Sequence, residues 1–185
     1  MKKTTGFTLV ELLVAIAIVA VLATLAAPSF VRLIQSNTIT SNVNNFLADL
    51  RYARSEAIRR DGSVIMCRSD APEAASPVCG SGSGPGGNGW VSGWIIFYDQ
   101  DGDGTRTAAS TDPVLRVQSP ITSIDSIVET GSTKFRFTPI GRLRSLSSAT
   151  SFQFGGSEYP NEIQRIVCVS VGGRGRIAGN GYASC

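Results

Sequence analysis

The feature that most constrains this chain is a long apolar stretch near its start, GFTLVELLVAIAIVAVLATLAAPSF, from Gly6 to Phe30. As a helix, residues 7–27 would be about 31 Å long at 1.5 Å per residue, which matches the hydrocarbon core of a bilayer. One carboxylate, Glu11, interrupts the stretch. Because a charge in a membrane span costs about 3 kcal/mol on insertion scales, its presence predicts a partner.

The helical pattern does not stop where the apolar stretch ends. Between residues 28 and 62, apolar residues recur mostly at spacings of three or four, and polar residues fill the other positions. This periodicity predicts an amphipathic continuation that ends at about Arg60, before Asp61 and Gly62. Pro28 predicts a bend within it. A cleaved secretory signal peptide is the alternative, and the length, the internal charge and this continuation argue against it.

The start of the stretch, GFTLVE (residues 6–11), follows a short basic leader. This segment resembles the processing signal of type IV prepilins. The resemblance implies that residues 1–6 are a leader, that a prepilin peptidase cuts between Gly6 and Phe7, and that Phe7 is then N-methylated. It also implies that Glu11 neutralises the new amine, of the same or a neighbouring subunit, during assembly. Snorkelling of Glu11 to the membrane interface is the alternative.

Beyond residue 62 the apolar pattern changes to a period of two, which is typical of β-strands. One long helix followed by antiparallel strands predicts an α+β architecture, and the resemblance implies a type IV pilin-like fold with a globular β domain over residues 63–185. Residues 71–89 are rich in Gly, Ser and Pro and predict a mobile surface loop. The expected strands cover residues 63–69, 90–99, 114–118, 124–129, 133–138, 151–154 and 163–171.

Four cysteines lie in two pairs that are each close in sequence: Cys67 with Cys79, and Cys168 with Cys185. No C-x-x-C motif occurs, so a zinc ribbon or a thioredoxin-like site is not expected. After a membrane-targeting segment, two disulfides are the simpler interpretation, and the local pairing is favoured although the spacing does not prove it. Each closed loop would contribute roughly 3 kcal/mol in the chain-entropy model, and both predict an oxidising compartment.

Composition excludes several classes of chemistry. The chain has no histidine, which rules out Ser-His-Asp catalysis and His-ligated metals. Without a nucleophile–base pair or a metal cluster, we expect no enzyme, no cofactor and no metal site.

Residues 99–104, DQDGDG, begin like a calcium-binding EF-hand loop, but the twelfth position is Ser110, which supplies no bidentate carboxylate. A turn between strands explains the same residues, and weak calcium binding is the alternative.

Charge is polarised along the chain. Residues 61–133 contain three basic and nine acidic side chains, whereas residues 134–176 contain seven basic and two acidic ones.

The basic part, residues 134–176, includes two R-x-R pairs. Two residues apart on extended backbone, such arginines would project from one face at a spacing of about 6.6 Å. Guanidinium groups match phosphate oxygens, so the pairs predict sequence-independent contact with a DNA backbone. The alternative is that they are solvated, or pair with the acidic part or a neighbouring subunit. The pairs are Arg142 with Arg144 and Arg174 with Arg176.

Two late segments, FTPIGR (137–142) and EIQRIVCVSVGGRGR (162–176), are similar to the end of the GspH/FimT family of minor pilins and pseudopilins. FimT-type members of competent bacteria capture DNA through a C-terminal G-R-x-R segment, which Arg174 and Arg176 match, whereas FimU-like members serve pilus assembly. A tail after residue 176, ending in Cys185, departs from that pattern.

This resemblance implies a minor pilin that inserts in the bacterial inner membrane through residues 7–27, with its N-terminus cytoplasmic and its head periplasmic. It would then join other pilins in a filament at the cell surface, with double-stranded DNA as a further partner. The alternative is a minor pseudopilin of a type II secretion system, which would serve protein export.

Overall fold

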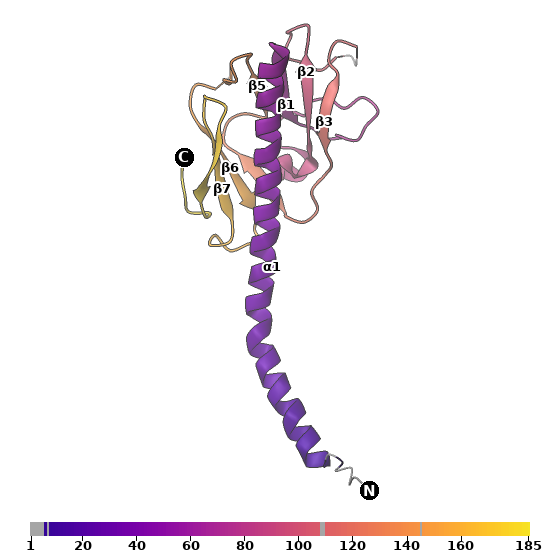
Figure 1. Cartoon of the computed structure of the whole chain (residues 1–185), viewed down its shortest axis with the longest axis vertical. Helices are drawn as coiled ribbons and strands as arrows, with labels where there is room; N and C mark the ends of the chain where they lie inside the picture. Colours follow the sequence, from indigo (N-terminus) through magenta and orange to yellow (C-terminus); the bar gives the residue numbers. More distant parts are fainter. Residues whose placement is uncertain (1–5, 7, 108–109, 145) are drawn as a thin grey trace.

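The computed structural model describes residues 6, 8–107, 110–144 and 146–185. A long helix, α1 (Leu9–Arg60), projects from a head that its C-terminal half packs against (Figure 1). The head comes from the rest of the chain and consists of two antiparallel sheets. This is the predicted α+β architecture.

Both ends of α1 are capped by residues near the predicted limits. The Thr8 hydroxyl accepts a hydrogen bond from the Glu11 backbone N–H at 3.2 Å, and the Glu11 carboxylate accepts one from the Thr8 N–H at 2.8 Å. This reciprocal arrangement is a capping box, which satisfies backbone donors that the first turn leaves free. Asp61 ends the helix with a left-handed backbone, φ 49°. Pro28 lies inside an unbroken helix, whose axis curves below the head (Figure 1).

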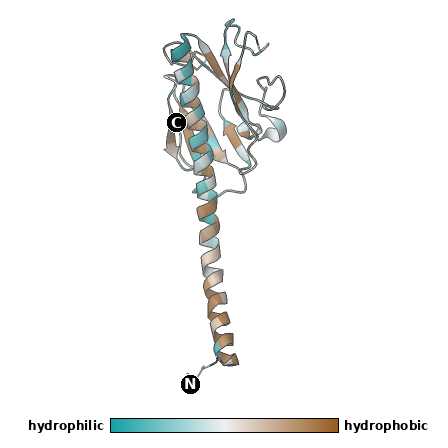
Figure 2. Ribbon diagram, turned by 45° about the vertical axis from the view of Figure 1, so that its right-hand side comes forward, coloured by the Kyte–Doolittle hydropathy of each residue, from teal (hydrophilic) through white to brown (hydrophobic). Residues whose placement is uncertain are grey.

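The N-terminal half of α1 is apolar and exposed, and Figure 2 shows it as the most hydrophobic part of the helix. Within the described residues, α1 is the one helix long and apolar enough to cross a membrane, with a mean hydropathy of 2.8 over its most apolar window. None of that window is buried against the head. This half thus has the length, the composition and the exposure expected of a membrane-spanning segment.

Two four-stranded sheets form the head. The first has the strand order β3-β2-β1-β5 and the second β4-β6-β7-β8, with antiparallel pairing throughout. The strands are β1 (Ser63–Arg68), β2 (Trp94–Asp99), β3 (Val114–Gln118), β4 (Ser126–Glu129), β5 (Lys134–Phe137), β6 (Thr150–Gly155), β7 (Arg165–Val169) and β8 (Gly175–Gly179).

The core lies where α1 meets both sheets, and Phe46 of α1 is at its centre. Its fully buried ring lies 5.5 Å from the ring of Phe154, 5.6 Å from that of Trp94 and 5.7 Å from that of Trp90. The Phe152 ring is closer, at 4.7 Å. Trp94 belongs to the first sheet and both phenylalanines to the second, so this one helical side chain joins the two sheets to α1.

The expected strands agree with the structure to within two residues at each end, except that one begins later and one strand was missed. The strand expected from Trp90 begins only at Trp94, because Trp90–Ser92 form a short 3-10 turn, η2, between two glycines of positive φ. Gly89 has φ 70° and Gly93 has φ 99°, a backbone that interrupts an extended run. Strand β8 was not predicted at all, since its sequence GRIAG lacks the β-branched alternation typical of strands.

The glycine-rich segment 71–89, predicted to be a mobile loop, is anchored at several points. A disulfide joins Cys67 to Cys79, and the fully buried Arg68 side chain donates a hydrogen bond to the Ser81 carbonyl at 2.6 Å. Arg68 also forms an ion pair with Asp70. Burial of a guanidinium is favourable only with such partners, so the interaction fixes the loop on the head.

Candidate functional site

The predicted GRGR segment lies at the turn of the β7–β8 hairpin. The Arg174 carbonyl accepts a hydrogen bond from the Ser170 N–H at 2.9 Å, and the Ser170 carbonyl accepts one from the Gly173 N–H at 2.8 Å. Gly173 has φ 72°, which a residue with a side chain rarely adopts. Arg174 therefore projects from a tight turn, and Arg176 lies in the strand that follows, opposite Cys168. Both side chains are exposed.

The second glycine of the segment holds the hairpin against α1. A Cβ atom on Gly175 would lie 2.5 Å from a methyl carbon of Leu47 and 2.8 Å from one of Leu50. Both leucines are buried in the core. The glycine is thus needed for close packing inside the head, as well as next to the arginines outside it.

Replacing Gly175 with valine is expected to force the hairpin away from α1 and to lower the free energy of unfolding by about 1–3 kcal/mol, the usual cost of overpacking. Chemical denaturation followed by tryptophan fluorescence measures this. The matched control is Gly172→Val in the same hairpin, because a Cβ at Gly172 meets only the Ser170 hydroxyl, at 3.7 Å, an ordinary contact distance. Equal stability of Gly175→Val and wild type would contradict the packing role.

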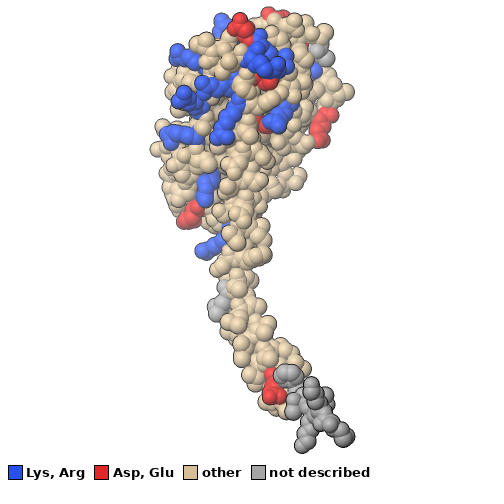
Figure 3. Space-filling view, in the orientation of Figure 1, with Lys and Arg blue, Asp and Glu red and all other residues tan. Residues whose placement is uncertain are grey.

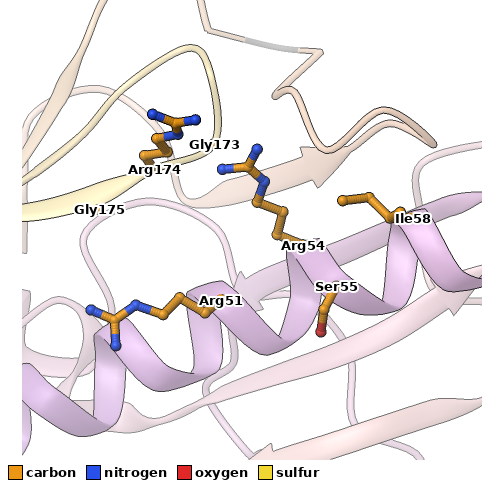
Figure 4. Close-up of a pocket in the computed structure, with 7 residues that line it drawn as sticks. All are labelled: Arg51, Arg54, Ser55, Ile58, Gly173, Arg174 and Gly175. Carbon is orange, nitrogen blue, oxygen red and sulfur yellow. The ribbon is translucent and has the colours of Figure 1, made fainter.

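Arg174 lies between two hollows of the surface. One, of about 390 Å³, is also lined by Arg176, Cys168 and Ser170. The other, of about 410 Å³, lies between the hairpin turn and α1, where it is lined by Arg51 and Arg54. Figure 4 shows Arg54 extending from α1 toward the turn that carries Gly173 and Arg174. The hairpin and the helix, far apart in sequence, thus present arginines to one region.

The R-x-R pair of Arg142 and Arg144 lies on a segment next to this turn. The Leu143 N–H donates to the Val171 carbonyl at 3.0 Å, and the Arg144 N–H donates to the Arg136 carbonyl of β5 at 2.9 Å. The segment therefore connects the edge of the first sheet to the β7–β8 turn of the second. Both arginines are exposed. The two predicted pairs are close neighbours because of this connection.

The four arginines of the two R-x-R pairs make no ion pair within the described part of the chain, and neither do Arg51 and Arg54. The two acids of the helix beside them are engaged elsewhere. Glu56 pairs with Arg59 and Arg60, and its pKa is lowered chiefly by its hydrogen bond with Arg59. Asp49 pairs with Arg116. Figure 3 accordingly shows basic side chains in the majority over the upper part of α1 and the head beside it.

The C-terminal tail is tied to the same region. A disulfide joins Cys168 of β7 to Cys185, as the local pairing predicted, and Cys168 lines the hollow shared by Arg174 and Arg176. The tail turns back after β8, with the Gly181 N–H donating to the Asn161 carbonyl at 2.8 Å. The arginines remain exposed with the disulfide formed, so the tail fixes the region without covering them.

The acidic residues Asp99, Asp101 and Asp103 place carboxylate oxygens within 4.8 Å of one another. Arg136 pairs with buried Asp99 at 2.9 Å and donates to the Gly102 carbonyl at 2.7 Å. Backbone N–H groups of the loop bind the carboxylates as well, with the Gly104 N–H donating to Asp99 at 3.2 Å. The Arg136 guanidinium thus pairs with one oxygen of Asp99, and backbone N–H groups bind oxygens of all three carboxylates, which favours the turn over a metal site.

At the other end of the molecule, Glu11 lies in the first turn of the exposed apolar half of α1. Its carboxylate binds the Thr8 backbone and the Thr8 hydroxyl, at 2.8 and 2.9 Å. Sequence reasoning missed this cap, although T-x-x-E before an apolar run is its ordinary signal. Gly6 is described and exposed, whereas Phe7, on the far side of the expected cleavage, lies outside the described residues.

Comparisons with known proteins agree with this arrangement. The family model described as type II transport protein GspH matches residues 42–173, and the prokaryotic N-terminal methylation motif matches residues 1–27. No curated protein sequence matches the chain significantly.

Two crystal structures of the type IV minor pilin FimU from Pseudomonas aeruginosa are similar in fold, each at 18% identity. One has a TM-score of 0.53 and covers 80% of this chain and 93% of FimU, and the other has 0.50 and covers 78% and 96%. The helix, the two-sheet head and the GspH match over more than half of the sequence lead to one conclusion: the chain belongs to the GspH family of type IV minor pilins and pseudopilins.

Proposed function

We propose that this protein is a minor subunit of a bacterial type IV pilus and that its head binds the backbone of double-stranded DNA through Arg174 and Arg176. Prepilin peptidase processes it between Gly6 and Phe7, and Glu11 directs its incorporation among other pilins. Its N-terminal half is held in the inner membrane until the filament takes it up. The pilus then carries the head to the cell surface, where the head supports natural transformation.

The observation that supports DNA binding is a cluster of exposed arginines that form no ion pair with any residue that the structure describes. An arginine already paired with a carboxylate gains little from a phosphate, because the old interaction must be broken first. Arg174 and Arg176 carry no such cost within the described residues. Their guanidinium groups donate to phosphate oxygens in bidentate geometry, and such contacts carry no sequence information.

The test is the affinity of the full-length protein, in nonionic detergent, for a short fluorescent DNA duplex. Arg174→Ala/Arg176→Ala is expected to weaken binding roughly tenfold, equally for unrelated sequences, since two phosphate contacts are lost. The matched control is Arg32→Ala/Arg59→Ala, which also removes two positive charges, that of Arg59 being already paired with Glu56. Equal affinities of the double variant and wild type would refute DNA binding by this segment.

A second candidate is a minor pseudopilin of a type II secretion system, and the description of the matching family, type II transport protein GspH, favours it. Both machines take up subunits with the same kind of N-terminal helix. A deletion strain scored separately for pilus number, DNA uptake and protein secretion distinguishes them. Loss of DNA uptake with normal secretion supports the pilus, whereas loss of secretion alone identifies the pseudopilin.

A further inference from the structure

One face of helix α1 lines the hollow of about 410 Å³ beside the GRGR turn, which we call the helix groove. Arg51, Arg54, Ser55 and Ile58 lie on this face at helical spacings of three and four, so their side chains are neighbours. Across the groove are Gly173, Arg174 and Gly175 of the hairpin turn. The groove is open to the surface and has a volume of about 410 Å³. No part of the sequence pattern connected these helical residues with the C-terminal arginines.

The side chain of Arg54 packs against the backbone of a glycine. A Cβ atom on Gly141 would lie 2.7 Å from Nε of Arg54 and 2.9 Å from Cδ1 of Ile58. The bare backbone at Gly141, which has φ 74°, therefore leaves space for the Arg54 side chain to lie along it toward the hairpin. Gly141 belongs to the FTPIGR segment, so that motif also shapes the groove.

The electrostatics of the groove suit an anion. Arg51 is exposed and Arg54 half-buried, and neither forms an ion pair within the described ranges of the chain. The seven residues that line the groove include three arginines and no acid. Like charges brought together without counter-charges are unfavourable, and a bound polyanion relieves their repulsion.

Arg174 lines both this groove and the hollow that contains Arg176. The two sites are thus adjacent, with one shared side chain at their boundary. A polymer with regularly repeated phosphates can contact both at once, whereas a single small anion occupies one. The shared arginine is the observation that favours a polymer over a small ligand.

We propose that Arg51 and Arg54 form the second half of the DNA-binding surface, so that one DNA strand crosses the β7–β8 turn from the Arg176 hollow into the helix groove. This inference rests on the proposed function and extends it to residues outside the GRGR segment. The surface therefore combines two parts of the chain that meet only in the folded protein. The contacts are with phosphates and carry no base specificity.

The experiment measures DNA affinity of the full-length protein in nonionic detergent across a series of NaCl concentrations. Each phosphate contact with duplex DNA contributes about 0.9 to the slope of log affinity against log salt. Arg51→Ala/Arg54→Ala is expected to reduce the slope by about 1.8 and to weaken binding roughly tenfold at fixed salt. Arg51→Lys/Arg54→Lys keeps both charges and is expected to keep the slope.

Two controls make the result specific. Arg32→Ala/Arg59→Ala removes the same charge from exposed positions of the same helix that do not line the groove, and its slope is expected to equal that of wild type. Thermal unfolding verifies that each variant is folded. An effect of Arg32→Ala/Arg59→Ala as large as that of the groove variant would overturn the proposal, since it would indicate a non-specific effect of net charge.

The remaining outcomes separate this inference from the function on which it rests. If Arg174→Ala/Arg176→Ala weakens binding and Arg51→Ala/Arg54→Ala does not, DNA binding stands and the helix groove is excluded from it. If neither pair matters, the proposed DNA binding itself fails. If the groove variant keeps DNA affinity but is lost from filaments, the groove is a contact for another subunit, and the proposal is again wrong.

Discussion

Replacing Phe46 with alanine is expected to lower the free energy of unfolding of the head by about 3–5 kcal/mol, the usual cost of removing a buried aromatic ring. The Phe46 ring contacts side chains from both sheets and is fully buried. Small domains have a total stability of about 5–15 kcal/mol, so the loss is a large fraction of it. The cavity left by the missing ring would remove contacts of α1 with both sheets.

The chain provides its own probe and control for this experiment. Its two tryptophans, Trp90 and Trp94, both pack near Phe46, so fluorescence during urea denaturation reports on the head alone. Phe30→Ala makes the same chemical change on the same helix at an exposed position, and we expect it to change stability by less than about 0.5 kcal/mol. A Phe46→Ala midpoint equal to that of Phe30→Ala would contradict the central role of this ring.

Glu11→Gln is expected to abolish incorporation of the protein into filaments. Glutamine still accepts hydrogen bonds and also occurs at this position of a capping box, so the helix start observed at Thr8 is retained. It cannot neutralise a positive amine, which is the role proposed for Glu11 in assembly. The variant therefore separates the charge of this residue from its capping function.

The measurement is the amount of the protein in sheared pili, relative to the amount in membranes, in a strain that expresses each variant. Thr8→Ala, which removes the capping hydroxyl but not the charge, is the control and is expected to be incorporated. Normal incorporation of Glu11→Gln together with loss of Thr8→Ala would indicate that Glu11 acts only as a helix cap.

Much of the architecture could be predicted because it depends on local sequence. The apolar stretch and its amphipathic continuation predicted a helix that ends near Arg60, and α1 ends there because Asp61 adopts the left-handed conformation. The pairing of cysteines close in sequence was also predicted correctly. By contrast, Trp90 was wrongly predicted to lie in a strand. The positive φ of its flanking glycines interrupts the strand, and the apolar pattern of the sequence does not show that conformation.

The candidate site could be predicted only in part. The GRGR segment is visible in the sequence, but β8 is a strand because it pairs with β7 and because Gly175 packs on α1, which are contacts across the fold. Arg51 and Arg54 were missed because they are two polar residues among many on an amphipathic helix. Their relation to Arg174 depends on the docking of the hairpin, which no local pattern contains.

We propose a DNA-binding surface made of exposed arginines from α1 and from the β7–β8 hairpin. Its most direct test is the salt dependence of DNA binding by the unmodified full-length protein. We expect log affinity to fall linearly with log salt, with a slope of roughly −3 to −4 from the four arginines of the two adjoining hollows. Affinity that is undetectable at low salt, or that does not change with salt, would contradict it.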